Sequence, residues 1–242
     1  MDNHFSIVIT AFNCGPWVKQ NISSVLSQDY SKYDIYYVDD FSQDDTKHQL
    51  QAFKGERIIP IFNNHNKGKM KNLIDVNSQL KSDTIIVVLD GDDWLHDNGV
   101  LGHLNDVYND ERVWMTNGSY IVKPSNEIVK PKIDPEYWNG HIRKKSWEFS
   151  HLGTFRKPLF DKIKKRDLMD KQGNYWSTTS DQAIMWPMVE MCGPEHHHVI
   201  ERVMYVYNRM NPISDDRINR IDQLQTEKTI REMKPYERLD SL

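Results

Sequence analysis

The first hundred residues alternate between short apolar runs and stretches with apolar residues at helical spacing. Four runs have the length and β-branched content of buried strands: Phe5–Thr10, Ile35–Val38, Ile58–Phe62 and Ile85–Leu89. The stretches between them place apolar residues on one face of a helix, at Val18, Ile22, Val25 and Leu26, at Leu50 and Phe53, and at Met70, Leu73, Ile74 and Leu80. Strands that alternate with helices predict a parallel sheet with right-handed crossovers, whose strands all end at the same edge.

After about residue 110 the pattern is less regular. A helix through Val100–Val107 precedes a short apolar run at 113–115, which we interpret as a strand, and Val199–Tyr207 predicts another. Residues 123–150 are rich in Pro, Lys and Trp without a clear period, which predicts a long loop over the site, because long loops in compact domains are usually functional. In the polar tail 214–242, apolar residues at roughly helical spacing predict a docked helix or an interaction surface.

The Ile85 strand leads directly into three carboxylates, Asp90, Asp92 and Asp93, with Gly91 between the first two. Open α/β sheets bind ligands at the carboxyl ends of their strands. Carboxylates this close repel one another unless a positive charge lies among them. Their hard oxygen atoms suit Mg²⁺ or Mn²⁺, and Mg²⁺ usually combines one or two carboxylates with substrate phosphates. The pattern therefore favours a metal-dependent phosphate-ester site over an ordinary acidic turn.

Composition narrows the class of protein. A chain of 242 residues forms one large domain or a domain with an appendage. A formal net charge of −4 argues against a nucleic-acid partner, which usually requires a basic face. Cys14 and Cys192 form neither a metal motif nor a disulfide framework, so we expect a reducing compartment. We see neither a signal peptide nor an apolar run long enough to span a bilayer.

Five short motifs occur in a characteristic order: Ser6–Asn13, Ser24–Gln28, Val38–Thr46, the segment from Asn66 to Gly68 with Lys71 and Asn72, and Asp90–Asp93. The series resembles family 2 glycosyltransferases of the GT-A fold, closely over residues 5–110 and more loosely to about 210. The resemblance implies an α/β fold with a mostly parallel, Rossmann-like sheet flanked by helices and a C-terminal acceptor-side extension. It implies one domain over 1–210, with a nucleotide-sugar part at 1–110 and an acceptor part at 111–210, followed by a helical tail at 211–242.

The same resemblance implies a reaction and its participants. A hexose would move from a nucleotide sugar, with UDP as the expected nucleotide, to a hydroxyl group of a glycan, a lipid-linked molecule or a protein. The anomeric carbon would be inverted, and the cofactor would be Mn²⁺ or Mg²⁺. We expect the protein in the cytoplasm, either free or peripheral to a membrane.

Matching positions assign the donor contacts. Thr10, Ala11 and Asn13 occupy positions that approach the nucleoside, and Asp39 would accept from the N–H of the base. Lys71 stands where relatives often have Arg near the base and the diphosphate, although a solvated Lys is an equal alternative. Asp90 would meet a ribose hydroxyl, Gly91 would lie beside it, and Asp92 would bind the metal.

Matching positions also assign the acceptor side. Inversion needs one general base, and Asp181 occupies the family's catalytic acid position at the start of a predicted helix. The alternative is that Ser180 or Asp181 simply caps that helix. Asp93, Trp147 and His151 are candidates for the acceptor side, and Asp93 or Glu148 is an alternative base.

Other interpretations remain open from the sequence. Trp138, Trp147 and Trp176 are stacking candidates for a sugar ring or core residues. His196, His197 and His198 invite a metal interpretation, but alternating side chains on a strand cannot all face one ion, which favours a partly exposed loop. A haloacid-dehalogenase-type phosphatase also has Asp-x-Asp after an apolar strand, but Trp94 stands where it needs Thr or Val. A non-catalytic nucleotide- or carbohydrate-binding relative is the other alternative.

Overall fold

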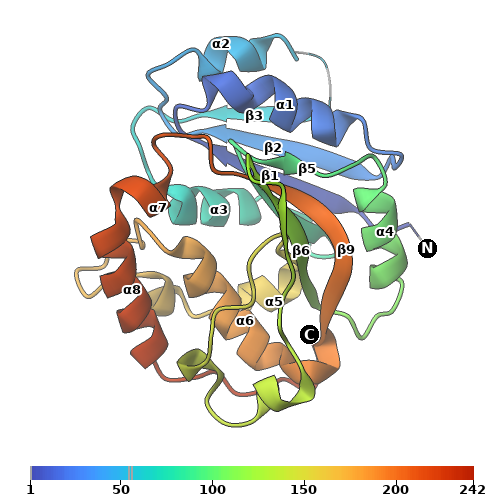
Figure 1. Ribbon diagram of the computed structural model, residues 1–242, viewed down its shortest axis with the longest axis vertical. Coiled ribbons are helices and arrows are strands. Elements are labelled where there is room, and N and C mark those ends of the chain that lie inside the picture. Colours follow the sequence, from blue (N-terminus) through green and yellow to red (C-terminus); the bar gives the residue numbers. More distant parts are fainter. Residues whose placement is uncertain (1, 54, 56) are drawn as a thin grey trace.

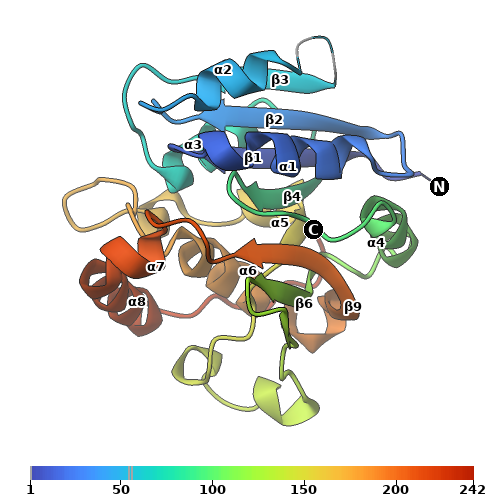
Figure 2. The same ribbon diagram turned by 45° about the horizontal axis from the view of Figure 1, so that its top comes forward.

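The computed structural model describes residues 2–53, 55 and 57–242. One nine-stranded sheet runs through the molecule in the order β3-β2-β1-β4-β8-β6-β9-β5, and β7 pairs with β6 outside this path. Figures 1 and 2 show helices on both faces of the sheet. The predicted α/β architecture with a largely parallel sheet flanked by helices is confirmed.

The N-terminal half is a parallel sheet of four strands. They are β1 (Phe5–Ala11), β2 (Tyr33–Asp39), β3 (Ile58–Phe62) and β4 (Ile85–Asp90). Helices alternate with them as predicted, namely α1 (Gly15–Leu26), α2 (Thr46–Gln51), α3 (Lys69–Asn77) and α4 (Val100–Tyr108), with the short strand β5 (Trp94–Leu95) before α4. The register pairs Thr10 with Asp90 and Ala11 with Asp39, so the ends of three strands lie side by side.

The C-terminal half adds strands in both directions. They are β6 (Met115–Lys123), β7 (Glu127–Val129), β8 (Thr154–Arg156) and β9 (His197–Asn208). β8 pairs antiparallel with β4, whereas β6 and β9 pair in parallel. The helical elements are the 3₁₀ turns η1 (Pro135–Trp138), η2 (Ile142–Lys144) and η3 (Lys165–Leu168) and the helices α5 (Lys157–Asp161), α6 (Ser180–His196), α7 (Asp215–Ile218) and α8 (Arg220–Glu232).

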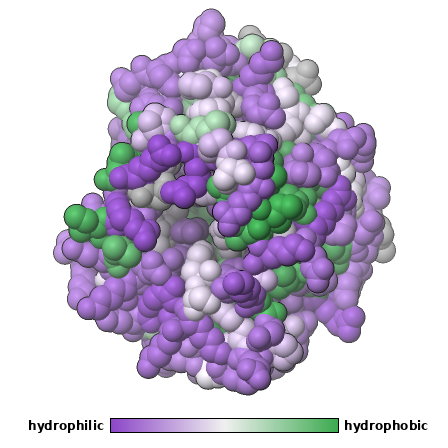
Figure 3. Space-filling model, in the orientation of Figure 1, coloured by the Kyte–Doolittle hydropathy of each residue, from purple (hydrophilic) through white to green (hydrophobic). Residues whose placement is uncertain are grey.

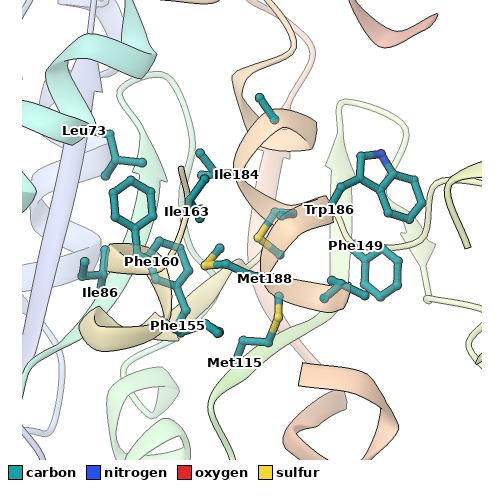
Figure 4. Close-up of a cluster of buried hydrophobic side chains, with 14 of the residues drawn as sticks. Leu73, Ile86, Met115, Phe149, Phe155, Phe160, Ile163, Ile184, Trp186 and Met188 are labelled. Carbon is teal, nitrogen blue, oxygen red and sulfur yellow. The ribbon is translucent and has the colours of Figure 1, made fainter. Parts of the chain in front are cut away.

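Two hydrophobic clusters lie on opposite faces of the sheet. Because strand side chains alternate between faces, Ile7 and Ile9 of β1 join a cluster with α1, α2 and α4, while Val8 joins one with α3, α5 and α6. Figure 4 shows the second cluster, in which Phe155, Phe160, Met188 and neighbouring side chains point toward one another. Both faces of β1 and β4 are thus covered, which explains their nearly continuous apolar sequences.

Two expectations for the C-terminal half are wrong. The strand expected at 113–115 begins at Met115 and continues to Lys123. Residues 123–150 are not a loop over the site, because they form β7, η1 and η2 and contribute no side chain to the pocket described below. Tyr137 and Phe149 are buried in the hydrophobic cluster around α6 instead.

The predicted C-terminal helix is present as α8. Its buried residue is Ile230, while Ile218, Ile221 and Leu224 stay exposed on this part of the chain. The division into a domain at 1–210 and a tail at 211–242 remains a prediction. Among the residues that the structure describes, no helix has both the length and the apolar character needed to cross a bilayer.

Candidate functional site

A cavity of about 300 Å³ lies at the carboxyl ends of β1 and β4, against the start of α6. It is lined by Thr10, Ala11, Phe12, Cys14, Asp40, Lys69, Asn72, Asp90, Asp92, Asp93, His151, Thr179, Ser180, Asp181, Tyr207, Asn211, Ile213, Ser214 and Gln223. Figure 3 shows the surface hollowed near its centre, with hydrophilic residues around the opening. The parallel strand order brings these residues together, because neighbouring parallel strands end at one edge.

The acidic turn after β4 is held from two sides. On one side, the buried Asn21 of α1 donates to the carbonyl oxygens of Asp90 (2.9 Å) and Asp93 (2.7 Å). On the other, the turn packs so closely on β1 that a Cβ at Gly91 would lie 2.6 Å from the Cβ of Ala11. Glycine is therefore needed here for a close approach of the two strands' ends.

The three carboxylates of this turn have different surroundings. Burial would raise the pKa of Asp90, but the ammonium group of Lys69 and the nearby His151 outweigh it and lower that pKa. Burial and the charge of Asp90 raise the pKa of Asp92, although Asn211 donates to its Oδ2 at 2.8 Å. The cluster is short of positive charge at Asp92, which is the situation that a bound cation relieves.

Asp93 is the most enclosed of the three. It is 1% exposed, and burial followed by the charges of Asp92 and Asp90 raises its pKa well above the usual range. Its Oδ1 accepts from the backbone N–H of Asn208 at 2.7 Å, and its Oδ2 accepts from the hydroxyl of Tyr205. Asp93 thus ties the turn to β9. Its expected acceptor-side role stays a prediction.

Lys69 is one of the pocket residues that the sequence argument missed. It is the first residue of α3 and contacts the Oδ1 of Asp90, and its charge also acts on Asp181. Successive helical residues turn by about 100°, so residues two apart face nearly opposite directions. Lys71 accordingly points away, pairs with Asp75 and lies 5.9 Å from the ring centre of Tyr175, and it does not line the pocket. The signal that could have identified Lys69 is its position directly after the Asn66–Gly68 turn.

Of the residues expected to contact the nucleoside, two line the pocket and two do not. Thr10 and Ala11 line it. Asn13, by contrast, holds the loop after β2, because its N–H donates to Ser42 Oγ at 2.8 Å and its Oδ1 accepts from Gln43 N at 2.7 Å. Asp39 is 3% exposed, accepts from Ser42 N at 3.3 Å and is not among the lining residues.

Asp40 lines the pocket and organises a second loop. Its Oδ1 accepts from the N–H of Lys67 at 2.9 Å, and its Oδ2 accepts from the N–H of Gly68 at 2.8 Å. The side chain of Asn63 also donates to Oδ1 at 2.8 Å. Asp40 therefore fixes the loop that leads into α3 and Lys69.

Asp181 lies in the first turn of α6 and lines the pocket. The helix is preceded by Thr179 as N-cap, in a left-handed conformation with φ 57°, so the alternative that Asp181 caps the helix is wrong. Solvent reaches the carboxyl group from the pocket, yet the surrounding walls remove enough water to raise its pKa, against the opposing effect of Lys69. A carboxylate with a raised pKa is a better proton acceptor near neutral pH.

His151 also lines the pocket and is held by two aromatic rings. It stacks on Tyr205 with ring centres 4.4 Å apart and on Tyr207 with ring centres 5.0 Å apart. Burial lowers its pKa to about 4, although the charge of Asp90 opposes this shift. The imidazole is therefore neutral at pH 7 and available as a hydrogen-bonding or ligand group.

The structure leaves other candidates outside the pocket. Trp147 packs edge-on against Trp186, with ring centres 5.1 Å apart, and Glu148 accepts from Lys132 N at 2.8 Å. The run from His196 to His198 is not a loop, because His196 ends α6 and His197 begins β9. The ring of His196 stacks on that of Trp114, with ring centres 3.5 Å apart. Trp138 and Trp176 also pack against the hydrophobic cluster around α6.

Three side chains at the pocket could ligate a divalent cation. Asp90, Asp93 and His151 each offer one ligand atom, and these atoms all lie within 4.8 Å of one another. Two carboxylates and a neutral imidazole are ligands that Mn²⁺ accepts. Asp92, the ligand expected from the sequence, lies outside this group but lines the same pocket.

Comparisons with known proteins agree with this geometry. The sequence model of glycosyl transferase family 2 matches residues 6–175, more than two thirds of the chain. Two Escherichia coli proteins named as UDP-Glc:alpha-D-GlcNAc-diphosphoundecaprenol beta-1,3-glucosyltransferases are similar. WfaP is 43% identical over 63 residues, which cover 26% of this chain and 25% of WfaP. WfgD is 29% identical over 139 residues, which cover 56% and 53%. The chain thus spans at most about half of these relatives.

Solved structures share the fold. Staphylococcus aureus TarS 1–349 in complex with UDP has a TM-score of 0.68 at 14% identity, covering 96% of this chain and 67% of that one. The mannosyltransferase PcManGT of Pyrobaculum calidifontis, in complex with GDP-Man and Mn²⁺, has a TM-score of 0.64 at 18% identity, covering 98% and 66%. The phosphatase alternative has no support in these matches. The chain belongs to glycosyl transferase family 2.

Proposed function

We propose that this protein transfers a hexose from a UDP-sugar to a hydroxyl group of a lipid-linked glycan, with inversion at the anomeric carbon and Asp181 as general base. The observation that supports it best is the joint position of Thr10, Asp90, Asp92 and Asp181 around one cavity. The named activities of the two Escherichia coli relatives support a UDP-sugar donor and a sugar attached to a lipid diphosphate as acceptor.

The donor is proposed to occupy the β1 and β4 side of the cavity. Thr10 and Ala11 present the end of β1 to the nucleoside. Asn13, after β1, and Asp39, at the end of β2, shape that end through their hydrogen bonds with Ser42. Lys69 offers a positive charge for the diphosphate. The same charge holds Asp90 in its ionised form, and Asp90 is the proposed acceptor for a ribose hydroxyl.

A divalent cation, Mn²⁺ or Mg²⁺, fits the remaining oxygen ligands. We propose Asp92 as its protein ligand, because the pKa of Asp92 is raised by burial and by Asp90, and a cation would relieve both effects. Asp90 and His151 line the same pocket and offer ligand atoms within 4.8 Å of each other, and we propose them as further ligands. When bound, such an ion offsets negative charge on the departing nucleoside diphosphate.

The transfer step needs one proton acceptor on the face opposite the leaving group. Asp181 takes the proton of the acceptor hydroxyl as its oxygen attacks the anomeric carbon and the bond to the diphosphate breaks. The raised pKa of Asp181 strengthens it as a base. Tyr205 and Tyr207 hold the imidazole of His151 in the pocket wall, where we propose that it orients the acceptor.

Replacing Asp181 with Asn tests this assignment. The amide keeps the shape but cannot accept the proton, so kcat should fall by roughly 10²–10⁴-fold, while calorimetric UDP-sugar affinity stays near wild type. Asp83→Asn, which neutralises an exposed carboxylate outside the pocket, is the matched control and should transfer normally. Normal transfer by Asp181→Asn would exclude it as the base.

The donor and the metal are tested separately. Nucleotide release from UDP-, GDP- and dTDP-sugars should be greatest with a UDP-sugar, and a chelator should abolish it until Mn²⁺ or Mg²⁺ is restored. Donor binding without transfer to any of a range of glycan acceptors would favour the non-catalytic binding alternative.

A further inference from the structure

An exposed apolar surface borders the pocket on the side of α7 and α8. Within 210–224, five large apolar side chains are exposed, and we call them the apolar rim: Met210, Ile213, Ile218, Ile221 and Leu224. Figure 3 shows hydrophobic residues beside the hollow, over α7 and the beginning of α8. Contiguous exposed apolar side chains on a soluble domain usually mark an interaction site.

The rim residues of α8 are not on its packing face. Ile221 and Leu224 are three residues apart, which places them on one side of α8, and Ile218 ends α7 just before it. The buried contact of α8 is made near its other end, by Ile230. Ile221 is 72% exposed, so most of the free energy available from burying it is not used within this chain.

The rim is continuous with the pocket. Ile213 belongs to the rim and also lines the pocket, together with Ser214 and Gln223. The carbonyl oxygen of Gln223 accepts from the hydroxyl of Thr179, two residues before Asp181. Whatever covers the rim therefore lies at the mouth through which an acceptor reaches Asp181.

The charge of α8 restricts the occupant. The helix carries three basic and three acidic residues, so it offers no net charge to an anionic surface. A neutral helix with an apolar side inserts shallowly at a lipid interface by burying that side rather than by attracting headgroups.

We propose that the apolar rim docks on the surface of a lipid bilayer and turns the mouth of the pocket toward the headgroup layer. This inference rests on the proposed function in one respect: a lipid-linked acceptor presents its sugar at that depth. The rim then brings Asp181 to a substrate that cannot leave the membrane.

Vesicle flotation of the full chain tests the rim without using catalysis. Wild type should float with phosphatidylcholine vesicles, with little change when phosphatidylglycerol or salt is added. Ile221→Ser should lower the partition coefficient by about tenfold, and Ile218→Ser/Ile221→Ser should lower it further. Ile59→Ser removes an exposed isoleucine from β3 and is the matched control, which should float like wild type.

Two results would overturn the inference: a wild type that does not float, or rim variants that float as well as wild type. If sedimentation velocity shows a dimer that the rim variants dissociate, and wild type does not float, the rim is a contact between copies and the inference is also wrong. UDP release with a short-chain, water-soluble acceptor should be equal in all variants. Loss of that reaction in wild type, with flotation as expected, would refute the proposed function and leave the rim standing.

Discussion

The buried ion pair between Arg143 and Glu190 offers the sharpest test of how the C-terminal segment is held. The two side chains are 1% and 4% exposed and form two parallel hydrogen bonds, of 2.6 and 2.7 Å. Arg143 also donates to the carbonyl oxygen of Ile230 at 2.7 Å, and Glu190 accepts from the N–H of Tyr236 at 3.0 Å. The pair thus joins η2, α6, the end of α8 and the chain beyond it.

The size of the effect follows from what each change leaves behind. Arg143→Met leaves the carboxylate of Glu190 buried with one backbone donor, and such uncompensated charges cost about 3–5 kcal/mol. Glu190→Leu leaves the guanidinium of Arg143 in the same position and should cost a similar amount. In the double variant no buried charge remains. The loss reduces to the unpaired N–H of Tyr236, at about 1–3 kcal/mol, because the carbonyl oxygen of Ile230 still accepts from the N–H of Met233 at 3.2 Å.

Urea unfolding of the four proteins measures this directly. We expect the double variant to be at least as stable as either single variant, which corresponds to a coupling of several kcal/mol. Arg238→Met breaks the exposed pair with Glu195, whose side chains are 56% and 58% exposed, and should cost less than about 1 kcal/mol. Additive single effects, or a cost for Arg143→Met no larger than that of the control, would refute the reasoning.

Three further predictions concern the pocket and the surface. Asp39→Ala should weaken calorimetric UDP binding by roughly ten- to hundredfold if its carboxylate accepts from the base, because a hydrogen bond to a charged group contributes about 1.5–3 kcal/mol; unchanged affinity would make it a turn residue. Lys69→Met should raise the pKa of Asp90 and weaken UDP-sugar binding by a similar factor, whereas Lys69→Arg should keep part of it, and equal affinity in Lys69→Met would exclude a diphosphate contact. The third prediction concerns Asp97 on the surface. Burial raises the pKa of Asp97, but the hydrogen bonds from Arg202 and from a backbone N–H outweigh burial and lower this pKa to about 2. The ionised Asp97 therefore stabilises the fold above about pH 4, and this contribution is lost as the pH falls toward 2. Both side chains are more than a third exposed, so Arg202→Gln should lower the free energy of unfolding at pH 7 by at most about 1 kcal/mol. The difference between variant and wild type should be smaller in unfolding curves at pH 3.

Local patterns predicted the elements of the N-terminal half. Ile58–Phe62 was predicted with its observed bounds, and the alternation of strands and helices determined the parallel sheet. Once strands are parallel, their carboxyl ends share one edge, so Thr10, Asp90 and Asp92 had to meet. Their position in one pocket required no knowledge of side-chain packing.

The tertiary structure decided which neighbours face that pocket. Helical spacing places Lys69 and Lys71 on nearly opposite sides of α3, and the rotation of α3 against the sheet decides that Lys69 is the one that faces the pocket. Trp147 was a candidate for a sugar ring or for the core until packing with Trp186, 39 positions away, placed it against the core. Contacts between residues so distant in the chain depend on how whole elements pack.

The sequence by itself therefore determined the family, the order of the elements and the acidic edge of the sheet, because these follow from short-range periodicity and from the direction of the strands. The structure determined the partners of each charge, the course of residues 123–150 and the exposure of the apolar rim. These features depend on which side of each helix or loop packs against the rest of the molecule. A local sequence pattern does not specify that packing, because it involves residues far apart in the chain.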